Sequence, residues 1–287
     1  MEFVGQTIVN GLVTSSFYAL IAVGLSLVFG VMNIVNFAHG ELYMLGAYMV
    51  WFLYAVGNMP FFAAVGVAIV VVALLGILLE RGIFRPVRGN MLSALIISVG
   101  MVFILQVSVG QIWGVGKMKP VPAALPGVIN LLGTSTSWQR LIVIPVAILL
   151  LGGLWVFLNR SRLGRGLRAA AQDSEAALLQ GISPNRSAAI AMLIGSAMAG
   201  AAGALMSPIM SVYPYMGHMV IWTCFVIIIV GGAGNIKGTI LAALFFGFLH
   251  TIITTLLDST IALIVSSLFM LIFLAIKPQG LLGYAER

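Results

Sequence analysis

The short stretch "NIVNFAHGE" concentrates polar side chains in a chain that is otherwise strongly apolar. Asn33, Asn36, His39 and Glu41 lie within nine residues and offer amide, imidazole and carboxylate groups that can bind a polar ligand or an ion. These groups are costly in lipid unless something satisfies them, and polar residues inside membrane segments commonly mark transport paths. The stretch is therefore the first candidate for a functional site.

The same stretch also has a purely local interpretation. Asn36 can cap the following helix, Gly40 permits close packing, and Glu41 stabilises the positive end of the helix dipole. The functional interpretation is that the break lines or controls a translocation path, because irregular backbone at membrane depth is tolerated where it borders a cavity or is buried in protein. Both interpretations stay open, since one residue can cap a helix and line a path.

The rest of the chain identifies the surroundings of these groups as a lipid bilayer. Of its 287 residues, 61% are hydrophobic and only 7% are charged, whereas a soluble domain carries roughly 25% charged residues. The apolar runs are continuous and near twenty residues long, which predicts spanning helices rather than the alternating strands of a barrel. The expected fold class is all-α: a polytopic membrane protein with a helical bundle of about nine transmembrane segments.

Composition and motifs also exclude several function classes. The net charge of +7 does not indicate a nucleic-acid partner, because the basic residues flank apolar segments, where they orient helices. The sequence holds no G-x-x-x-x-G-K-[ST] phosphate loop, no paired carboxylates and no Cys/His cluster with metal spacing. We therefore expect no catalytic residue, no metal site and no cofactor on this chain, which is not expected to be an enzyme. Because the first basic residue is Arg81, the first apolar run is expected to be a retained span rather than a signal peptide.

Nine apolar segments are predicted, each close to the roughly 28 Å that a 19-residue helix spans. They cover residues 8–30, 40–57, 61–79, 91–112, 141–158, 188–207, 215–231, 238–257 and 260–276. Nine crossings place eleven lysines and arginines on one side and three, namely Lys117, Lys119 and Arg140, on the other. The richer side is cytoplasmic by the positive-inside rule, so the N-terminus is expected outside and the C-terminus in the cytoplasm.

Residues 1–287 are expected to form one membrane domain with two long loops. The external loop, residues 113–139, is rich in proline and glycine and is predicted to be an irregular cap. The internal loop, residues 159–187, is basic and contains a predicted helix of about two turns, "SEAALLQ".

The predicted internal helix has clear ends. Asp173 or Ser174 can cap its start, and Gly181 supplies its C-terminal stop. Ser183 and Pro184 are then predicted to be the cap and the first position of the next helix. A helix this short is marginal in water, so a cytosolic docking partner is expected, with a solvated surface helix as the alternative.

One sequence pattern occurs twice, over residues 28–49 and 229–249: an apolar run, a glycine, an asparagine-bearing break and a new apolar helix. Both breaks follow an outside-to-inside span, so they are candidates for equivalent positions in two parallel repeats. Interrupted segments in corresponding halves point to a transport path. The candidates for the inner part of the path and its gate are Asn33, Asn36, His39, Gly40, Glu41, Gly231, Gly232, Gly234 and Asn235. The alternative is two glycine-rich turns that only cap helices.

Five motifs resemble those of a known family. Glu175-Ala176-Ala177, three residues and then Gly181 resemble the E-A-A-x-x-x-G pattern of ABC importer permeases. The stretches "NIVNFAHGELYMLGAY", "RPVRGN", "VGGAGNIKGTILAALFFGFL" and "KPQGLLG" resemble the permeases of branched-chain amino acid importers, LivH type. These matches follow one another in order through nearly the whole chain.

The resemblance implies a permease subunit in a multi-pass arrangement in a bacterial-type plasma (inner) membrane, in contact with membrane lipid. Its partners would be a second permease subunit, with a heterodimer favoured, two ATP-binding cassette subunits, and an extracytoplasmic substrate-binding protein. ATP and Mg would be bound by the cassette subunits, not by this chain. The residues implied in coupling to the ATPase are Asp173, Glu175, Ala176, Ala177 and Gly181.

The implied cargo is branched-chain or other hydrophobic amino acids. Urea or short-chain amides are the alternative within the same architecture, because related permeases for those share these motifs. A function of another class is an ion-coupled secondary transporter, which would need an intramembrane carboxylate; Glu41 is the candidate within a span.

Overall fold

The computed structural model describes residues 2–116, 118–131 and 133–282, and these residues are mostly helical. The helices are α1 (Glu2–Met32), α2 (His39–Val50), α3 (Phe61–Leu79), α4 (Met91–Trp113), α5 (Trp138–Leu141), α6 (Val143–Arg160), α7 (Arg162–Gln172), α8 (Ser174–Leu179), α9 (Pro184–Met206), α10 (Met216–Gly231), α11 (Ile236–Leu256) and α12 (Ser259–Ile276). A π-helical segment, Trp51–Val56, continues α2. A π-helical segment, Glu80–Phe84, and a 3-10 turn, Arg85–Val87, continue α3.

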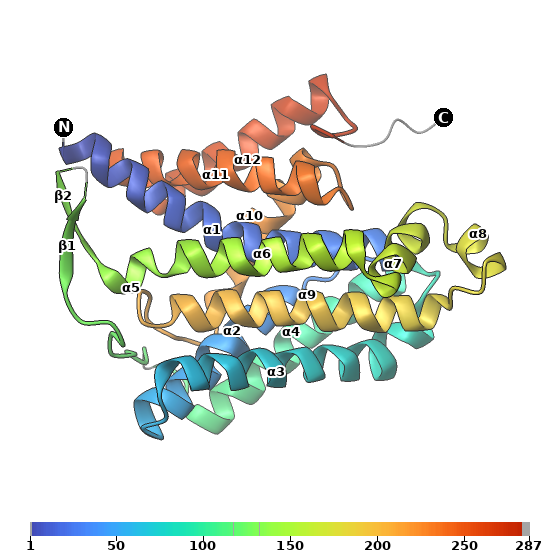
Figure 1. Cartoon of the computed structure of the whole chain (residues 1–287), viewed down its shortest axis with the longest axis horizontal. Coiled ribbons are helices and arrows are strands. Elements are labelled where there is room, and N and C mark those ends of the chain that lie inside the picture. The colour runs from blue at the N-terminus through green and yellow to red at the C-terminus, as the bar shows by residue number, and fades with distance from the viewer. Residues whose placement is uncertain (1, 117, 132, 283–287) are drawn as a thin grey trace.

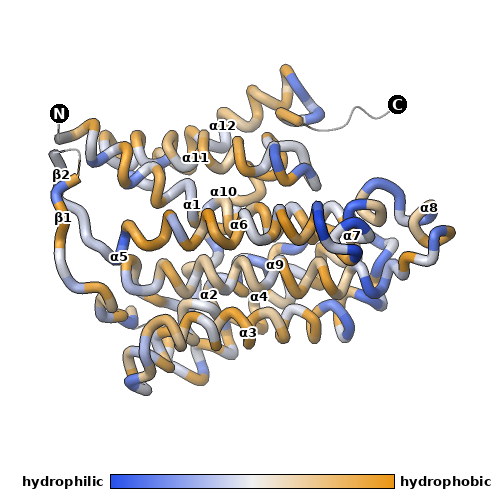
Figure 2. The backbone as a smooth tube through the Cα atoms, in the orientation of Figure 1, coloured by the Kyte–Doolittle hydropathy of each residue, from blue (hydrophilic) through white to orange (hydrophobic). Residues whose placement is uncertain are grey.

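The long helices lie side by side, and the two ends of the bundle differ in character (Figure 1). One end carries the hairpin of β1 (Val128–Leu131) and β2 (Thr134–Ser137), and we call it the β end. The other end carries α7 and α8, and we call it the α8 end. Polar residues gather at the α8 end, whereas the helices between the ends are mostly apolar (Figure 2).

Each of the nine predicted apolar segments is helical in the structure, with boundaries that agree within a few residues at most ends. Among the described residues, seven helices are long and apolar enough to cross a membrane: α1, α3, α4, α6, α9, α11 and α12. The apolar helix α10 has only 16 residues, and the second predicted segment is divided between α2 and a π-helical continuation. The fold is therefore that of a polytopic helical membrane protein, and these lengths alone do not establish nine crossings.

Small residues let α1 and α11 pack tightly along their length in opposite directions. Near the β end, the hydroxyl of Ser15 donates to the carbonyl of Leu244 at 3.1 Å. Further along, Thr239 donates to Ser26 at 3.0 Å in a fully buried contact. Hydroxyl pairs of this kind satisfy polar groups that lipid cannot, so they hold helices together inside a membrane.

Helix α9 lies in the centre of the bundle against α1, α2 and α3. A Cβ added to Gly195 would lie 2.8 Å from the carbonyl oxygen of Gly24 in α1, and one added to Gly203 would collide with the carbonyl of Tyr43 in α2. These small residues therefore serve close packing between the helices. Their absence of side chains brings α2 directly against the central helix.

Two elements differ from what the sequence indicates. The external loop is not wholly irregular, because β1 and β2 pair antiparallel with Val128 opposite Ser137 and Leu131 opposite Thr134. Threonine and serine alternate along β2, and Gly133 at the turn has φ +77°. The internal loop contains a second helix, α7, whose Leu167 is buried and which was not predicted.

Candidate functional site

The break after α1 begins with a left-handed residue. Asn33 has φ +53°, a conformation that asparagine adopts more readily than most residues, and its N–H donates to the carbonyl of Phe29 at 2.8 Å. Residues 33–36 then have no regular structure, and α2 begins at His39. The residue that precedes α2 is Ala38, and no side chain caps this helix. The local interpretation that Asn36 caps α2 is therefore wrong.

Helix α2 begins well inside the bundle rather than at the α8 end. A Cβ added to Gly40 would lie 2.6 Å from the carbonyl oxygen of Gly217, in the first turn of α10. The fourteen residue-to-residue steps from Gly217 to Gly231, where α10 ends, rise about 21 Å. The chain therefore turns back at Asn33 and runs into the protein as irregular backbone before α2 starts, the arrangement that membranes tolerate only where protein or a cavity surrounds it.

The polar side chains at the start of α2 are buried but incompletely satisfied. The amide nitrogen of Asn36 contacts the sulfur of Met192 at 4.0 Å, and one oxygen of Glu41 accepts from the amide of Gln106 at 2.9 Å. Within the described part of the chain, no partner is found for the amide oxygen of Asn36, both ring nitrogens of His39, or the second oxygen of Glu41. Each unmade hydrogen bond of this kind costs about 1–3 kcal/mol.

Glu41 and Gln106 line a cavity of about 720 Å³ between α2, α4 and α10. Aromatic side chains form part of its wall: the ring of Phe37 meets that of Trp222 edge-on at 5.8 Å. Sequence reasoning missed Gln106, although a glutamine within a mostly apolar span was a signal that could have found it. A polar group at that depth needs a partner, and Glu41 supplies it.

The second break, between α10 and α11, has a different geometry. Gly232 and Gly234 have φ +96° and +82°, and together with Asn235 they form a tight turn. Asn235 caps α11, because its side chain accepts from the N–H of Gly238 at 3.1 Å. The glycine at 234 lies against Gly30 of α1, with 3.1 Å between an added Cβ and the opposite Cα.

The structure therefore brings together only part of the predicted set. The turn formed by Gly231, Gly232, Gly234 and Asn235 adjoins the end of α1, where Asn33 lies, at the α8 end. The start of α2, with His39, Gly40 and Glu41, lies farther into the bundle beside the other end of α10.

The helix predicted in the internal loop is present as α8. Asp173 caps it by accepting from the N–H groups of Glu175 and Ala176, both at 2.9 Å, and Gly181 follows its end with φ +79°. Ser183 then caps α9, whose first residue is Pro184. Ala177 is buried, whereas Leu178 and Leu179 are exposed, so α8 presents apolar side chains to solvent at the α8 end.

An ion cluster lies at the same end, where α3 approaches α9. Glu80 is fully buried and accepts two hydrogen bonds from Arg85 and one from Arg88. Arg88 also donates to Asn185 at 2.8 Å, in the first turn of α9. The cluster ties the end of α3 to the helix that directly follows α8.

The comparison with known families decides the class of the chain. Residues 7–275 match the profile of the family described as "Branched-chain amino acid transport system / permease component". The chain belongs to this family. Membership confirms the expectation of a non-catalytic subunit, and a permease component works with the other subunits of its transport system.

Relatives span nearly the whole of this permease-family chain. It is 35% identical to the high-affinity branched-chain amino acid transport system permease protein LivH of Escherichia coli and 33% identical to BraD of Pseudomonas aeruginosa; in each case the match covers 98% of this chain and 96% of the relative. The probable LivH of Methanocaldococcus jannaschii is 27% identical, covering 96% of this chain and 91% of the relative. A solved structure titled "PsaBC from Streptococcus pneumoniae in complex with Fab" has a similar fold, with a TM-score of 0.53 at 16% identity, covering 94% of this chain and 91% of that one.

Two further cavities of this permease-family chain contrast with the one at Glu41. A cavity of about 620 Å³ lies between α1, α10, α11 and α12 and is lined by hydroxyl groups, His250 and Arg140. There His250 hydrogen-bonds within its own helix, to Thr254 at 3.4 Å, and meets the ring of Tyr18 edge-on at 5.9 Å.

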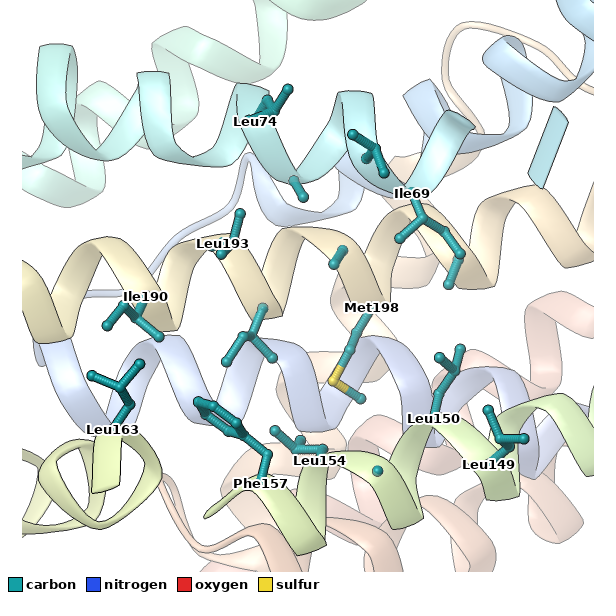
Figure 3. A pocket seen from close by; sticks show the side chains of 16 residues that line it. Ile69, Leu74, Leu149, Leu150, Leu154, Phe157, Leu163, Ile190, Leu193 and Met198 are labelled. Carbon is teal, nitrogen blue, oxygen red and sulfur yellow. The ribbon is translucent and has the colours of Figure 1, made fainter. Parts of the chain in front are cut away.

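The third cavity, of about 680 Å³, lies between α3, α6 and α9 and is lined by apolar residues only. Figure 3 shows leucine, isoleucine, methionine and phenylalanine side chains gathered around it, including Leu154, Phe157 and Met198. None of its described lining residues carries a polar side chain. It offers nothing that could hold the charged groups of an amino acid.

Proposed function

We propose that this chain is a permease subunit of an ATP-driven importer and forms part of the translocation path for branched-chain and other hydrophobic amino acids. The observation that carries the proposal is the interrupted segment between α1 and α2, where a helix begins inside the bundle beside buried polar groups without partners. Interrupted helices of this kind are the usual setting of transport sites. The names of the relatives supply the cargo class.

We further propose the partners that such a subunit requires: a second permease subunit, two ATP-binding cassette subunits that hold ATP and Mg, and an external substrate-binding protein. Helix α8 and its ends, comprising Asp173, Glu175, Ala176, Ala177 and Gly181, dock on a cassette subunit. Two features support this assignment. The helix is capped at its start, and it exposes Leu178 and Leu179 to solvent, a small apolar surface that suits a docking partner.

The proposed topology has nine crossings, formed by the seven long helices, α10, and α2 with its π-helical continuation. Basic residues at the α8 end support a cytoplasmic location for that end, with the N-terminus outside. They are Arg81, Arg85, Arg88, Arg160, Arg162, Arg165, Arg168, Arg186, Lys237 and Lys277. At the β end the described chain has Lys119 and Arg140; Lys117 and Arg287, which also entered the sequence-based assignment, lie outside the described residues. The whole chain then acts as one permease domain of a plasma membrane importer.

The test is uptake by the reconstituted transporter. The complete complex, with its cassette subunits in proteoliposomes, is supplied with ATP, its binding protein and radiolabelled leucine, isoleucine or valine. We expect uptake that needs both ATP and the binding protein. Uptake of urea or acetamide in place of the amino acids would refute the cargo, and uptake driven by an ion gradient without ATP would refute the importer class.

A further inference from the structure

The cavity between α2, α4 and α10 holds a carboxylate that its own surroundings do not neutralise. Glu41 is 1% exposed, and its second oxygen has no hydrogen-bond partner within the described chain. The cavity's described lining includes no lysine or arginine. Both ion pairs found among the described residues belong to Glu80, at the α8 end.

We infer that Glu41 and Gln106 form a transit site for the ammonium group of the transported amino acid. This inference rests on the proposed function and names the chemical group that the translocation path recognises. A desolvated carboxylate needs a cation that also donates hydrogen bonds, because charge-assisted bonds are the ones that offset its burial. An ammonium has three donors. In this site its donors would be shared between the oxygens of Glu41 and the amide oxygen of Gln106, whose nitrogen already donates to Glu41.

The remaining wall of the cavity suits the aliphatic part of such a substrate. Its volume of about 720 Å³ lies within the roughly 300–1,000 Å³ typical of small-molecule sites. Leu95, Val99 and Ile221 provide apolar surface, and the ring of Trp222 lies on the same lining as the carboxylate. An aromatic face near a carboxylate also favours a cation.

The two further cavities described above lack this combination. The hydroxyl-lined cavity contains Arg140, whose charge repels an ammonium, and no carboxylate lines it among the described residues. The cavity between α3, α6 and α9 has only apolar side chains. Of the three, the cavity at Glu41 is therefore the one whose chemistry matches the positive group of a zwitterion.

The same geometry makes the site weak, as passage requires. Glu41 lies in the first turn of α2, where the helix dipole stabilises a negative charge, and Gln106 adds a hydrogen bond. The ammonium therefore gains only part of what it would gain from a bare carboxylate. A group held in this way can bind and leave again.

The first experiment measures ATP-driven leucine uptake by the reconstituted complex with Glu41→Gln, which keeps the size and hydrogen-bonding capacity of the side chain and removes its charge. We expect uptake to fall at least tenfold, while the variant still assembles with its partner subunits. Glu41→Asp, which restores the charge, should recover part of the uptake. Gln106→Leu should reduce uptake severalfold, whereas the matched control Gln111→Leu, at an exposed position on the same helix, should not.

The second experiment tests whether the site recognises the ammonium group of the substrate itself. Val102→Cys places a thiol on the cavity lining, while the native Cys224 is buried. Millimolar leucine should slow modification of this thiol by a small aqueous reagent at least threefold. 4-Methylpentanoate, which has the same carbon chain without the ammonium, should not slow it. Adding Glu41→Gln should abolish the protection by leucine.

Three results would overturn the inference. They are leucine uptake by Glu41→Gln within twofold of the unmodified complex, equal protection by 4-methylpentanoate and leucine, and full protection by leucine in the double variant. The two protection measurements also distinguish a binding site from a carboxylate with only a structural role, because a structural role would not make protection depend on the ammonium. Failure of the proposed function looks different, because the unmodified complex would then not take up leucine at all.

Discussion

Replacing Gly40 with alanine should separate α2 from α10 and weaken both the fold and the site. The added Cβ would lie 2.6 Å from the carbonyl oxygen of Gly217 and 2.9 Å from the Cβ of Ile221. Ordinary contact begins at 3.4 Å, so the first contact alone requires a movement of 3.4 − 2.6 = 0.8 Å. Neither obstacle can rotate away, because one is backbone and the other is the first atom of a β-branched side chain.

The energetic cost follows from that movement. Overpacking a close contact costs about 1–3 kcal/mol, and the better helix propensity of alanine returns up to about 1 kcal/mol. A central overpacking cost of about 2 kcal/mol, less the return of up to about 1 kcal/mol, leaves a net loss of about 1–2 kcal/mol. Each kcal/mol lowers the melting temperature by roughly 2–4 °C in a chain of this size. If the whole movement fell along the Glu41–Gln106 hydrogen bond, its length would become 2.9 + 0.8 = 3.7 Å, too long for a hydrogen bond.

The assay is thermal stability of the purified complex, followed by fluorescence-detected size exclusion, together with leucine uptake. The matched control is Gly66→Ala in α3, where an added Cβ meets nothing within 4 Å and the position is exposed. The control should be as stable as the unmodified protein or more stable, whereas Gly40→Ala should melt several degrees lower and take up less leucine. Equal melting temperatures and equal uptake for the two variants would refute the packing argument.

Three other predictions concern the α8 end and the topology. A cysteine at position 186 should react with impermeant reagents only from the cytoplasm, and one at position 118 only from outside; reaction of position 186 from outside would overturn the nine-crossing arrangement. Glu175→Arg, or Gly181→Val at φ +79°, should reduce ATP hydrolysis stimulated by the loaded binding protein at least fivefold without preventing insertion, and normal coupling in both variants would remove α8 as the docking element. Arg88→Ala removes bonds to Glu80 and Asn185 and should destabilise the protein by about 1–3 kcal/mol, measured as a lower melting temperature, whereas exposed Arg81→Ala should change it little. An Arg88→Ala variant that melts with the unmodified protein would show that the cluster contributes no stability.

The parts of the fold that the sequence predicts well depend on local signals. Apolar runs of membrane length gave all nine helical segments, and the caps at Asp173 and Ser183 with the stop at Gly181 gave α8 and the start of α9. Helix α7 was missed because its apolar residues are few and its arginines resemble those of an ordinary basic loop. The hairpin was missed because its short strands lie in a segment rich in proline and glycine.

The geometry of the candidate site depends on contacts that no local pattern contains. Glu41 meets Gln106 across 65 positions of sequence, and the depth at which α2 begins is set by the approach of Gly40 to Gly217. The sequence marked the polar residues of the break, since their cost in lipid is visible from composition. It did not reveal that the break runs back into the bundle, because the course of this segment is fixed by its contacts with α4, α9 and α10.

The two breaks look alike in sequence, yet the polar residues of the second stabilise the fold and those of the first destabilise it. At the second break, Asn235 caps α11 and its amide donates to the carbonyl of Leu282 at 2.6 Å, so the turn stabilises the structure. At the first break, Ala38 leaves α2 without a side-chain cap, and four buried polar atoms on Asn36, His39 and Glu41 have no partner in the described chain. At about 1–3 kcal/mol for each such atom, apolar side chains there would give a more stable protein. Stability therefore accounts for the asparagine of the second break and not for the polar residues of the first; the proposed transit site would give one of them, Glu41, a role.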